Sequence, residues 1–192
     1  MTTVVAVKKN GWVAIAADTL TMWGNMKESA EHIANNEKIL KFQDNFLAFT
    51  GASSFKLVVE HWLLNSKRKP KFDSVEEIFD SWLSFHKLLK DRYYLRPEDE
   101  DSDEFETSRM NVLIANPKGI FAVGVLRSVN EYKRFTAFGS GCDYAIGAMR
   151  AVYDDETKSA EDIAKIGIKV AAEFDDGTDL PMHCYAVKLK QI

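Results

Sequence analysis

The sequence has no run of about 20 consecutive apolar residues, which is the length that a membrane-spanning helix needs. Its first residues also lack the basic region, apolar region and cleavage site that make up a secretory signal. We therefore expect a cytoplasmic protein with no membrane partner. Basic residues are not in excess either, since the net charge is −4, and nothing in the composition indicates a nucleic-acid partner.

Cysteine is scarce. Cys142 and Cys184 lie far apart, form no Cys-x-x-Cys pair and belong to no spacing typical of a metal site. In a reducing compartment we expect two free thiols. A single catalytic cysteine is the alternative, but no activating base can be located for it. We expect no metal and no cofactor.

The composition does not indicate a disordered chain, because its 46% apolar and 28% charged residues are close to the average of globular proteins. No linker or internal repeat divides the chain, so we expect a single domain over residues 1–192. One exception is the stretch from Pro97 to Glu104, which holds six acidic residues and no apolar one. It predicts a solvated, mobile loop over 97–109, with a docking surface for a basic partner as the alternative.

Hydrophobic periodicity predicts strands in runs and helices in pairs. The expected strands are 3–8, 12–17, 38–42, 45–50, 110–116, 119–126, 134–138 and 183–189. The expected helices begin near 54, 74, 142 and 159. This order lacks the β-α alternation of a doubly wound sheet, and it favours an α+β fold with antiparallel sheets covered by helix pairs.

Thr2 is the first candidate catalytic residue. If Met1 is removed, the threonine hydroxyl gains its own α-amino group as a neighbouring base. Such an amine has an ordinary pKa of about 7.7–8.0, and the pair is a recognised form of activated nucleophile. Taken alone, Met1-Thr2 is a common beginning of cytosolic chains, so an incidental Thr2 is the alternative.

Asp18 ends an otherwise apolar strand, and an unpaired buried carboxylate is costly. Lys38, at the beginning of a later strand, is the natural partner. An ammonium near Thr2 would lower the pKa of both the hydroxyl and the amine. A purely structural ion pair is the alternative interpretation.

Two further turns hold candidates. Gly51 follows a strand, where a glycine leaves its N–H available as an oxyanion donor, or simply makes a turn. Ser140 lies in a Gly-Ser-Gly turn before a helix, where it would orient the terminal amine or cap the helix. Asp175 and Thr178 lie in a glycine-containing loop that would otherwise be an ordinary turn.

Together these residues resemble the proteasome β-subunit family of N-terminal-nucleophile threonine peptidases. The closest similarity is to the bacterial HslV peptidase and the betaproteobacterial proteasome homologue. Residues 2–18 align without gaps to the beginning of the family pattern, and residues 36–39, 49–52 and 138–141 and the final strand follow in family order.

The resemblance implies a four-layer αββα sandwich and a threonine-type endopeptidase that acts on peptides or unfolded proteins through an acyl-enzyme. It implies self-assembly into two stacked rings of six or seven subunits, and it leaves the need for an ATP-dependent unfoldase open. The implied catalytic residues are Thr2, Asp18, Lys38, Gly51, Ser140, Asp175 and Thr178. The implied substrate-binding residues are Met22, Phe49 and Ser53.

Three features depart from the family pattern. Four extra residues lie between Gly24 and Lys38, the region 66–109 is longer than in HslV, and residues 175–178 match only loosely. Two other functions remain open at this point. One is an N-terminal-nucleophile amidohydrolase acting on a small amide, and the other is a non-catalytic ring or scaffold subunit, which would usually lack the terminal threonine and the lysine.

Overall fold

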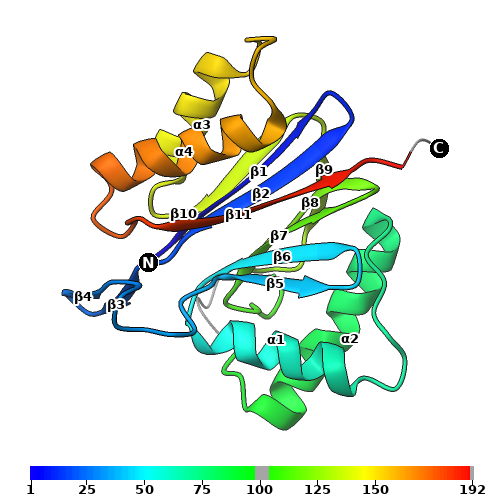
Figure 1. The fold of residues 1–192 in the computed structure, drawn as a ribbon. Coiled ribbons are helices and arrows are strands. Elements are labelled where there is room, and N and C mark those ends of the chain that lie inside the picture. Colours follow the sequence, from blue (N-terminus) through cyan, green and yellow to red (C-terminus); the bar gives the residue numbers. More distant parts are fainter. Residues whose placement is uncertain (98–103, 191–192) are drawn as a thin grey trace.

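A computed structural model describes residues 1–97 and 104–190. Two antiparallel sheets face each other, and a pair of helices covers the outer side of each (Figure 1). This arrangement is the αββα sandwich, and it confirms the α+β fold class predicted from the order of the elements.

Sheet 1 contains both ends of the described chain. Its strands, in the order β10-β1-β2-β11, are all antiparallel neighbours. A tight turn joins β1 to β2, and both of its residues, Asn10 and Gly11, have positive φ angles, as a two-residue Asn-Gly hairpin turn requires. The bounds are β1 (Thr3–Lys9), β2 (Trp12–Asp18), β10 (Phe135–Gly139) and β11 (Met182–Lys188).

Sheet 2 is a five-stranded antiparallel meander in chain order. A separate short hairpin of β3 and β4 leads from β2 towards it (Figure 1). The bounds are β3 (Thr21–Trp23), β4 (Met26–Glu28), β5 (Ile39–Phe42), β6 (Asn45–Thr50), β7 (Asn111–Asn116), β8 (Gly119–Val123) and β9 (Val129–Tyr132).

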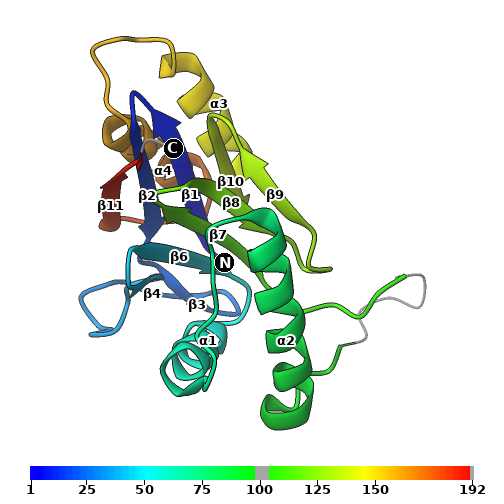
Figure 2. The same ribbon diagram turned by 90° about the vertical axis from the view of Figure 1, so that its right-hand side faces the viewer.

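Four helices form the outer layers. Helices α1 and α2 pack on sheet 2, while α3 and α4 pack on sheet 1 (Figures 1 and 2). Side-chain caps mark two of their beginnings: Ser74 accepts from the Glu77 N–H, and Ser159 forms a reciprocal capping box with Asp162. The bounds are α1 (Ser54–Asn65), α2 (Val75–Tyr93), α3 (Cys142–Val152) and α4 (Ala160–Phe174).

The apolar core follows the alternation of side chains along the strands. In β1, Val4 and Ala6 belong to the cluster between the two sheets, whereas Val5 and Val7 belong to the cluster beneath α3 and α4. All four are fully buried. Because both faces of β1 and β2 are covered, their sequences are nearly continuous apolar runs, and the polar end of β2 at Asp18 therefore stands out.

Several predicted boundaries were wrong. The strand predicted over 119–126 ends at Val123, because a turn closed by a bond from the Gly124 N–H to the Ser128 carbonyl (2.9 Å) interrupts it. Strand β9 beyond that turn and the β3–β4 hairpin were not predicted from the sequence. Helix α2 ends at Tyr93, since Tyr94 adopts the left-handed conformation (φ 56°).

The acidic loop was predicted over residues 97–109, and its residues 98–103 lie outside the described residues. At its described edges, the Thr107 N–H donates to the Pro97 carbonyl over 2.9 Å. In the described part of the chain, no helix is long and apolar enough to cross a membrane.

Candidate active site

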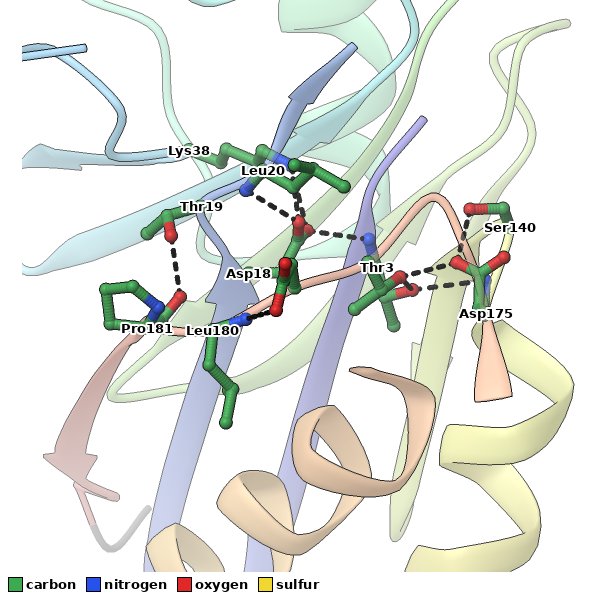
Figure 3. A network of polar contacts seen from close by, with 12 residues as sticks. Thr3, Asp18, Thr19, Leu20, Lys38, Ser140, Asp175, Leu180 and Pro181 are labelled. Atoms are coloured by element: carbon green, nitrogen blue, oxygen red, sulfur yellow. Dashed lines mark hydrogen bonds and ion pairs between the residues drawn. The ribbon is translucent and has the colours of Figure 1, made fainter. Parts of the chain in front are cut away.

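The predicted site residues gather at the end of the sandwich where β1 begins and β2 ends. Figure 1 shows the N-terminus there, between the two sheets. Two networks of polar contacts meet at the first residue of β1, Thr3 (Figure 3). One network involves the ion pair predicted at the end of β2, and the other involves the loop after α4.

Asp18 and Lys38 form the predicted ion pair. Lys38 Nζ lies 2.9 and 2.8 Å from the two carboxylate oxygens of Asp18. The same oxygens accept the backbone N–H groups of Thr3 (2.9 Å) and Leu20 (3.0 Å). The Asp18 side chain is fully buried and that of Lys38 is 15% exposed. The pair is therefore almost dry, and each carboxylate oxygen has two donors.

Burial dominates the electrostatics of this pair. It raises the pKa of Asp18 and lowers the pKa of Lys38, while their mutual attraction and hydrogen bonds oppose both shifts. A lysine in this setting loses its proton more readily than one at the surface. Its ammonium is nevertheless hydrogen-bonded to both carboxylate oxygens, so the geometry is that of an ion pair.

The second network starts from the Thr3 hydroxyl. Thr3 Oγ1 lies 2.5 Å from Thr178 Oγ1 and accepts the Gly141 N–H over 3.1 Å. The Thr178 hydroxyl in turn donates to Asp175 Oδ2 (2.5 Å), and the Ser140 hydroxyl donates to the same oxygen (2.7 Å). The structure thus brings together the predicted residues Ser140, Asp175 and Thr178.

Thr2 lies between these networks and is 8% exposed. Its carbonyl accepts the Ser140 N–H over 3.0 Å. Met1 is 60% exposed, and its side chain lies against Gly177. A Cβ atom placed on Gly177 would lie 2.5 Å from Met1 Cβ and 2.6 Å from Ser140 Oγ. The residue before Thr2 therefore lies beside the Ser140 hydroxyl.

Sequence reasoning missed Thr3 and the glycines that let these segments approach each other. Gly139 has a φ of 105°, and a Cβ atom on it would collide with the Thr2 carbonyl. Gly177 leaves the room just described for Met1 and Ser140. Each of these glycines directly precedes a predicted polar residue, Ser140 or Thr178. A glycine in such a position is typical of a close approach between backbone segments, and this pattern could have indicated them.

Gly51 follows the last residue of β6. The pairing of Ile39 with Ala48 places Lys38 and Gly51 at the same end of sheet 2. Gly51 has a φ of 115°, and an added Cβ atom would lie 2.8 Å from the Arg109 carbonyl oxygen. Its N–H makes no hydrogen bond with residues 1–97 or 104–190, so a donor is free at this position.

The three predicted substrate-binding residues lie in different elements and differ in exposure. Phe49 is 7% exposed and belongs to the core beneath α1 and α2, because Ala48 takes the face of β6 that points to sheet 1. Met22 is half-buried in β3. Ser53 is exposed at the beginning of α1 and makes no capping hydrogen bond. Phe49 thus offers little surface to a substrate.

Other features of the described residues lie elsewhere. A cavity of about 690 Å³ lies between α1 and α2, and its lining includes Trp62, Leu83 and Arg92 but none of the predicted catalytic residues. No group of three or more His, Cys, Asp or Glu side chains in the described ranges is arranged to hold a metal ion.

Comparison with known proteins gives the family. No family model matches the chain. The chain is 30% identical over 182 residues to the ATP-dependent protease subunit ClpQ of Bacillus velezensis, covering 90% of this chain and 89% of that protein. It is 28% identical over 178 residues to the ATP-dependent protease subunit HslV of Thermosipho melanesiensis, covering 90% of each. It is 23% identical to the proteasome subunit beta of Nanoarchaeum equitans, covering 100% of this chain and 95% of that one.

Solved structures similar to this chain come from the same group of proteins. BPH of Thiobacillus denitrificans superimposes with a TM-score of 0.94 at 46% identity, covering 98% of both chains. The same protein in complex with epoxomicin gives 0.93 at 45% identity, covering 98% of this chain and 100% of that one. HslV of Trypanosoma brucei shares the fold, with a TM-score of 0.71 at 18% identity, covering 97% of this chain and 99% of that one.

The fold is thus that of the N-terminal-nucleophile hydrolases. The chain belongs to the proteasome β-subunit family, together with HslV and ClpQ. This membership confirms the resemblance that was carried by residues 2–18 and the later motifs.

The close approach at Gly139 gives a stability prediction. We expect Gly139→Ala to lower the free energy of unfolding by more than about 2 kcal/mol, since a methyl group collides with the Thr2 carbonyl and φ is positive. Gly147→Ala is the matched control, because Gly147 is exposed in α3 with nothing within 4 Å of an added Cβ. It should raise stability by up to about 1 kcal/mol. Urea unfolding at one protein concentration measures both, and equal effects would contradict the prediction.

The ion pair gives a pH-dependent prediction. Lys38→Met leaves the Asp18 carboxylate buried without its cation, at a cost of about 3–5 kcal/mol near pH 7. Burial raises the pKa of Asp18 in the folded state above its value of about 3.9 in the unfolded chain. Stability of the variant is therefore retained at low pH and lost as pH rises. Urea unfolding at pH 4.5 and pH 7.5 measures this difference.

The control for this experiment is the double variant Asp18→Asn/Lys38→Met. It lacks both titrating groups of the ion pair, so its stability relative to the unmodified protein should depend much less on pH. If Lys38→Met were equally destabilised at both pH values, the buried carboxylate would not be the cause.

Proposed function

We propose that the chain is a threonine-type endopeptidase subunit whose nucleophile is the Thr2 hydroxyl after removal of Met1. The main supporting observation is the anchoring of β1, in which the Asp18–Lys38 pair holds the N–H of Thr3, the neighbour of Thr2. The similarity to a protein solved in complex with epoxomicin, at 45% identity over nearly the whole chain, supports a common binding site.

In the proposed reaction, the α-amine of Thr2 takes the hydroxyl proton directly or through a water. The freed oxygen attacks the carbonyl carbon of the substrate peptide bond, and the carbonyl oxygen becomes an oxyanion. The Gly51 N–H stabilises this charge. When the tetrahedral intermediate collapses, the C–N bond breaks, the leaving amine takes the proton from the α-ammonium of Thr2, and Thr2 carries the acyl group as an ester. Water then hydrolyses the ester and restores the hydroxyl.

Lys38 supplies positive potential to this site. A nearby ammonium lowers the pKa of a hydroxyl and of an amine, since it disfavours the added proton on each. Asp18 fixes the position of Lys38 through both carboxylate oxygens. Asp18 itself faces the backbone N–H groups of Thr3 and Leu20, so its role is to position rather than to exchange protons.

Ser140 orients the terminal amine. Because its hydroxyl donates to Asp175, its oxygen lone pairs remain available to accept a hydrogen bond from the amine. Thr178 donates to the same carboxylate and shares a short contact with the Thr3 hydroxyl. This network thus sets the direction of the Ser140 acceptor and the position of the first residue of β1.

Removal of Met1 is the activating step in this proposal. While Met1 is attached, the Thr2 nitrogen belongs to a peptide bond and is not a base. The Met1 side chain also lies beside Ser140, where the free amine of Thr2 would be oriented.

We further propose assembly into two stacked rings with the Thr2 sites inside a chamber, which would restrict substrates to peptides and unfolded proteins. Exposed apolar side chains on both helix layers support contacts between subunits. Tyr144 of α3 stacks on Phe174 of α4 with both rings exposed, and Leu57, Leu64, Phe79 and Leu83 are exposed on α1 and α2. The ATP-dependent relatives support an ATPase partner.

Intact-mass analysis after treatment with an epoxyketone inhibitor tests the proposal. We expect one adduct on protein that lacks Met1, together with loss of peptide hydrolysis. Thr2→Ala should form no adduct and hydrolyse no peptide. The control is Thr157→Ala, a threonine exposed in the α3–α4 loop, which should be labelled like the unmodified protein. Hydrolysis by Thr2→Ala, or by protein that retains Met1, would contradict the mechanism.

A further inference from the structure

Lys38 reaches the site from a segment with little regular structure. Between β4 and β5, residues 29–38 form turns and extended chain without a strand partner. Lys38 itself precedes sheet 2, whereas its partner Asp18 ends β2 in sheet 1 (Figure 3). The four-carbon side chain of a lysine is flexible, so its ammonium is held in one place only if its backbone is also held.

The neighbouring residue Glu37 is tied to sheet 1 by Tyr185. Tyr185 lies in β11, and its hydroxyl donates to Glu37 Oε1 over 2.5 Å. The Glu37 side chain therefore connects the chain immediately before Lys38 to the strand beside β2. This contact takes no part in the Asp18–Lys38 pair and has no role in the reaction proposed above.

Two more contacts hold this connection in place. The Tyr185 ring stacks on Phe46 of β6, with ring centroids 5.1 Å apart and planes 13° from parallel, so the tyrosine is fixed between the two sheets. The Lys56 ammonium, from α1, donates a short hydrogen bond to the Glu37 carbonyl. Residue 37 is thus held through both its side chain and its backbone, from β11 and from α1.

We propose that Tyr185 and Glu37 are positioning residues that keep the Lys38 ammonium over Asp18 and close to Thr2. This inference rests on the proposed function, because it deepens the role given there to Lys38. Tyr185 is the key member, since its hydroxyl forms the contact and its ring is locked by Phe46.

The hydrogen bond between Tyr185 and Glu37 is expected to persist over a wide pH range. The hydrogen bond to Glu37, together with burial, raises the pKa of Tyr185 to about 12. The phenol therefore keeps its proton and remains a donor throughout the pH range in which a peptidase of this kind works. Loss of the Tyr185–Glu37 hydrogen bond would let Lys38 move away from Thr2. The repulsion between the Lys38 ammonium and a proton on the Thr2 amine would then weaken, because Coulomb energy falls with distance. The amine of Thr2 would then hold its proton more tightly, and activity would need a higher pH.

Tyr185→Phe tests this prediction, because it removes the hydroxyl while keeping the ring and all charges. We expect kcat for peptide hydrolysis to fall by roughly 3- to 30-fold, less than the ~100-fold that a full ångström of misplacement can cost. KM should change by less than about twofold, since no substrate contact is removed. The ascending limb of the pH profile of kcat/KM should move upward by roughly half a pH unit.

Tyr153→Phe is the matched control. The Tyr153 hydroxyl donates to the Lys8 carbonyl over 2.6 Å at the other end of β1, so its loss removes a similar bond far from Thr2. We expect a comparable loss of stability in urea unfolding but no shift of the pH profile. A Tyr185→Phe profile that superimposes on that of Tyr153→Phe would overturn the inference.

Glu37 variants separate the hydrogen bond from the charge. Glu37→Gln keeps an acceptor for the Tyr185 hydroxyl and should retain kcat within about threefold, whereas Glu37→Ala should fall as far as Tyr185→Phe. The double variant Tyr185→Phe/Glu37→Ala should be no worse than either alone, because both remove the same contact. Additive losses would overturn the inference. These variants also keep the test open if Tyr185→Phe does not fold.

The proposed function fails separately from this inference. If Thr2→Ala still hydrolyses peptides, the mechanism is wrong. If the unmodified protein is labelled at Thr2 and active, but Tyr185→Phe has an unchanged pH profile, only the positioning role is wrong.

Discussion

The buried ion pair between Asp18 and Lys38 is the constraint on which this end of the molecule depends. It joins the last residue of β2 in sheet 1 to the chain that enters sheet 2, and it does so almost without solvent. Removing two charges from water is costly, and this cost is met only when the geometry is good and the remaining lone pairs are used. The N–H groups of Thr3 and Leu20 use them. The ion pair therefore fixes the beginning of β1, and with it Thr2.

Thr3 takes part in both polar networks of the candidate site. Its N–H belongs to the Asp18 network and its hydroxyl to the Thr178 network, so each side of β1 is held by different elements. Residues 139–141 approach Thr2 and Thr3, and residue 177 approaches Met1 and Ser140, more closely than a side chain would allow. The glycines at these positions are thus part of the site, although they carry no functional group.

The sequence could predict the features whose physical cause is local. The strands near residues 3–8 and 12–17, the helix that begins near residue 159 and the pairing of Asp18 with Lys38 each follow from hydrophobic periodicity or from the cost of a buried charge. Thr3 was missed because a β-branched residue in a strand looks like an ordinary strand former. β9 was missed because its residues, Val129–Tyr132, are half-buried or exposed and carry no apolar alternation. The placement of Phe49 depends on which face of β6 meets the helices, which the sequence alone did not resolve.

In the proposed function, the contacts of Tyr185 give the Lys38 charge support beyond its own ion partner. Burial penalises Lys38 as well as Asp18, so the arrangement competes with one in which the lysine turns towards solvent, where 15% of its side chain already lies. Asp18 opposes that motion only through the ammonium at the tip of a flexible side chain. Tyr185 and Lys56 act on the preceding residue and hold the backbone. Because Tyr185 is itself stacked on Phe46 between the sheets, the residue that we propose to position Lys38 is also part of the packing between the two sheets.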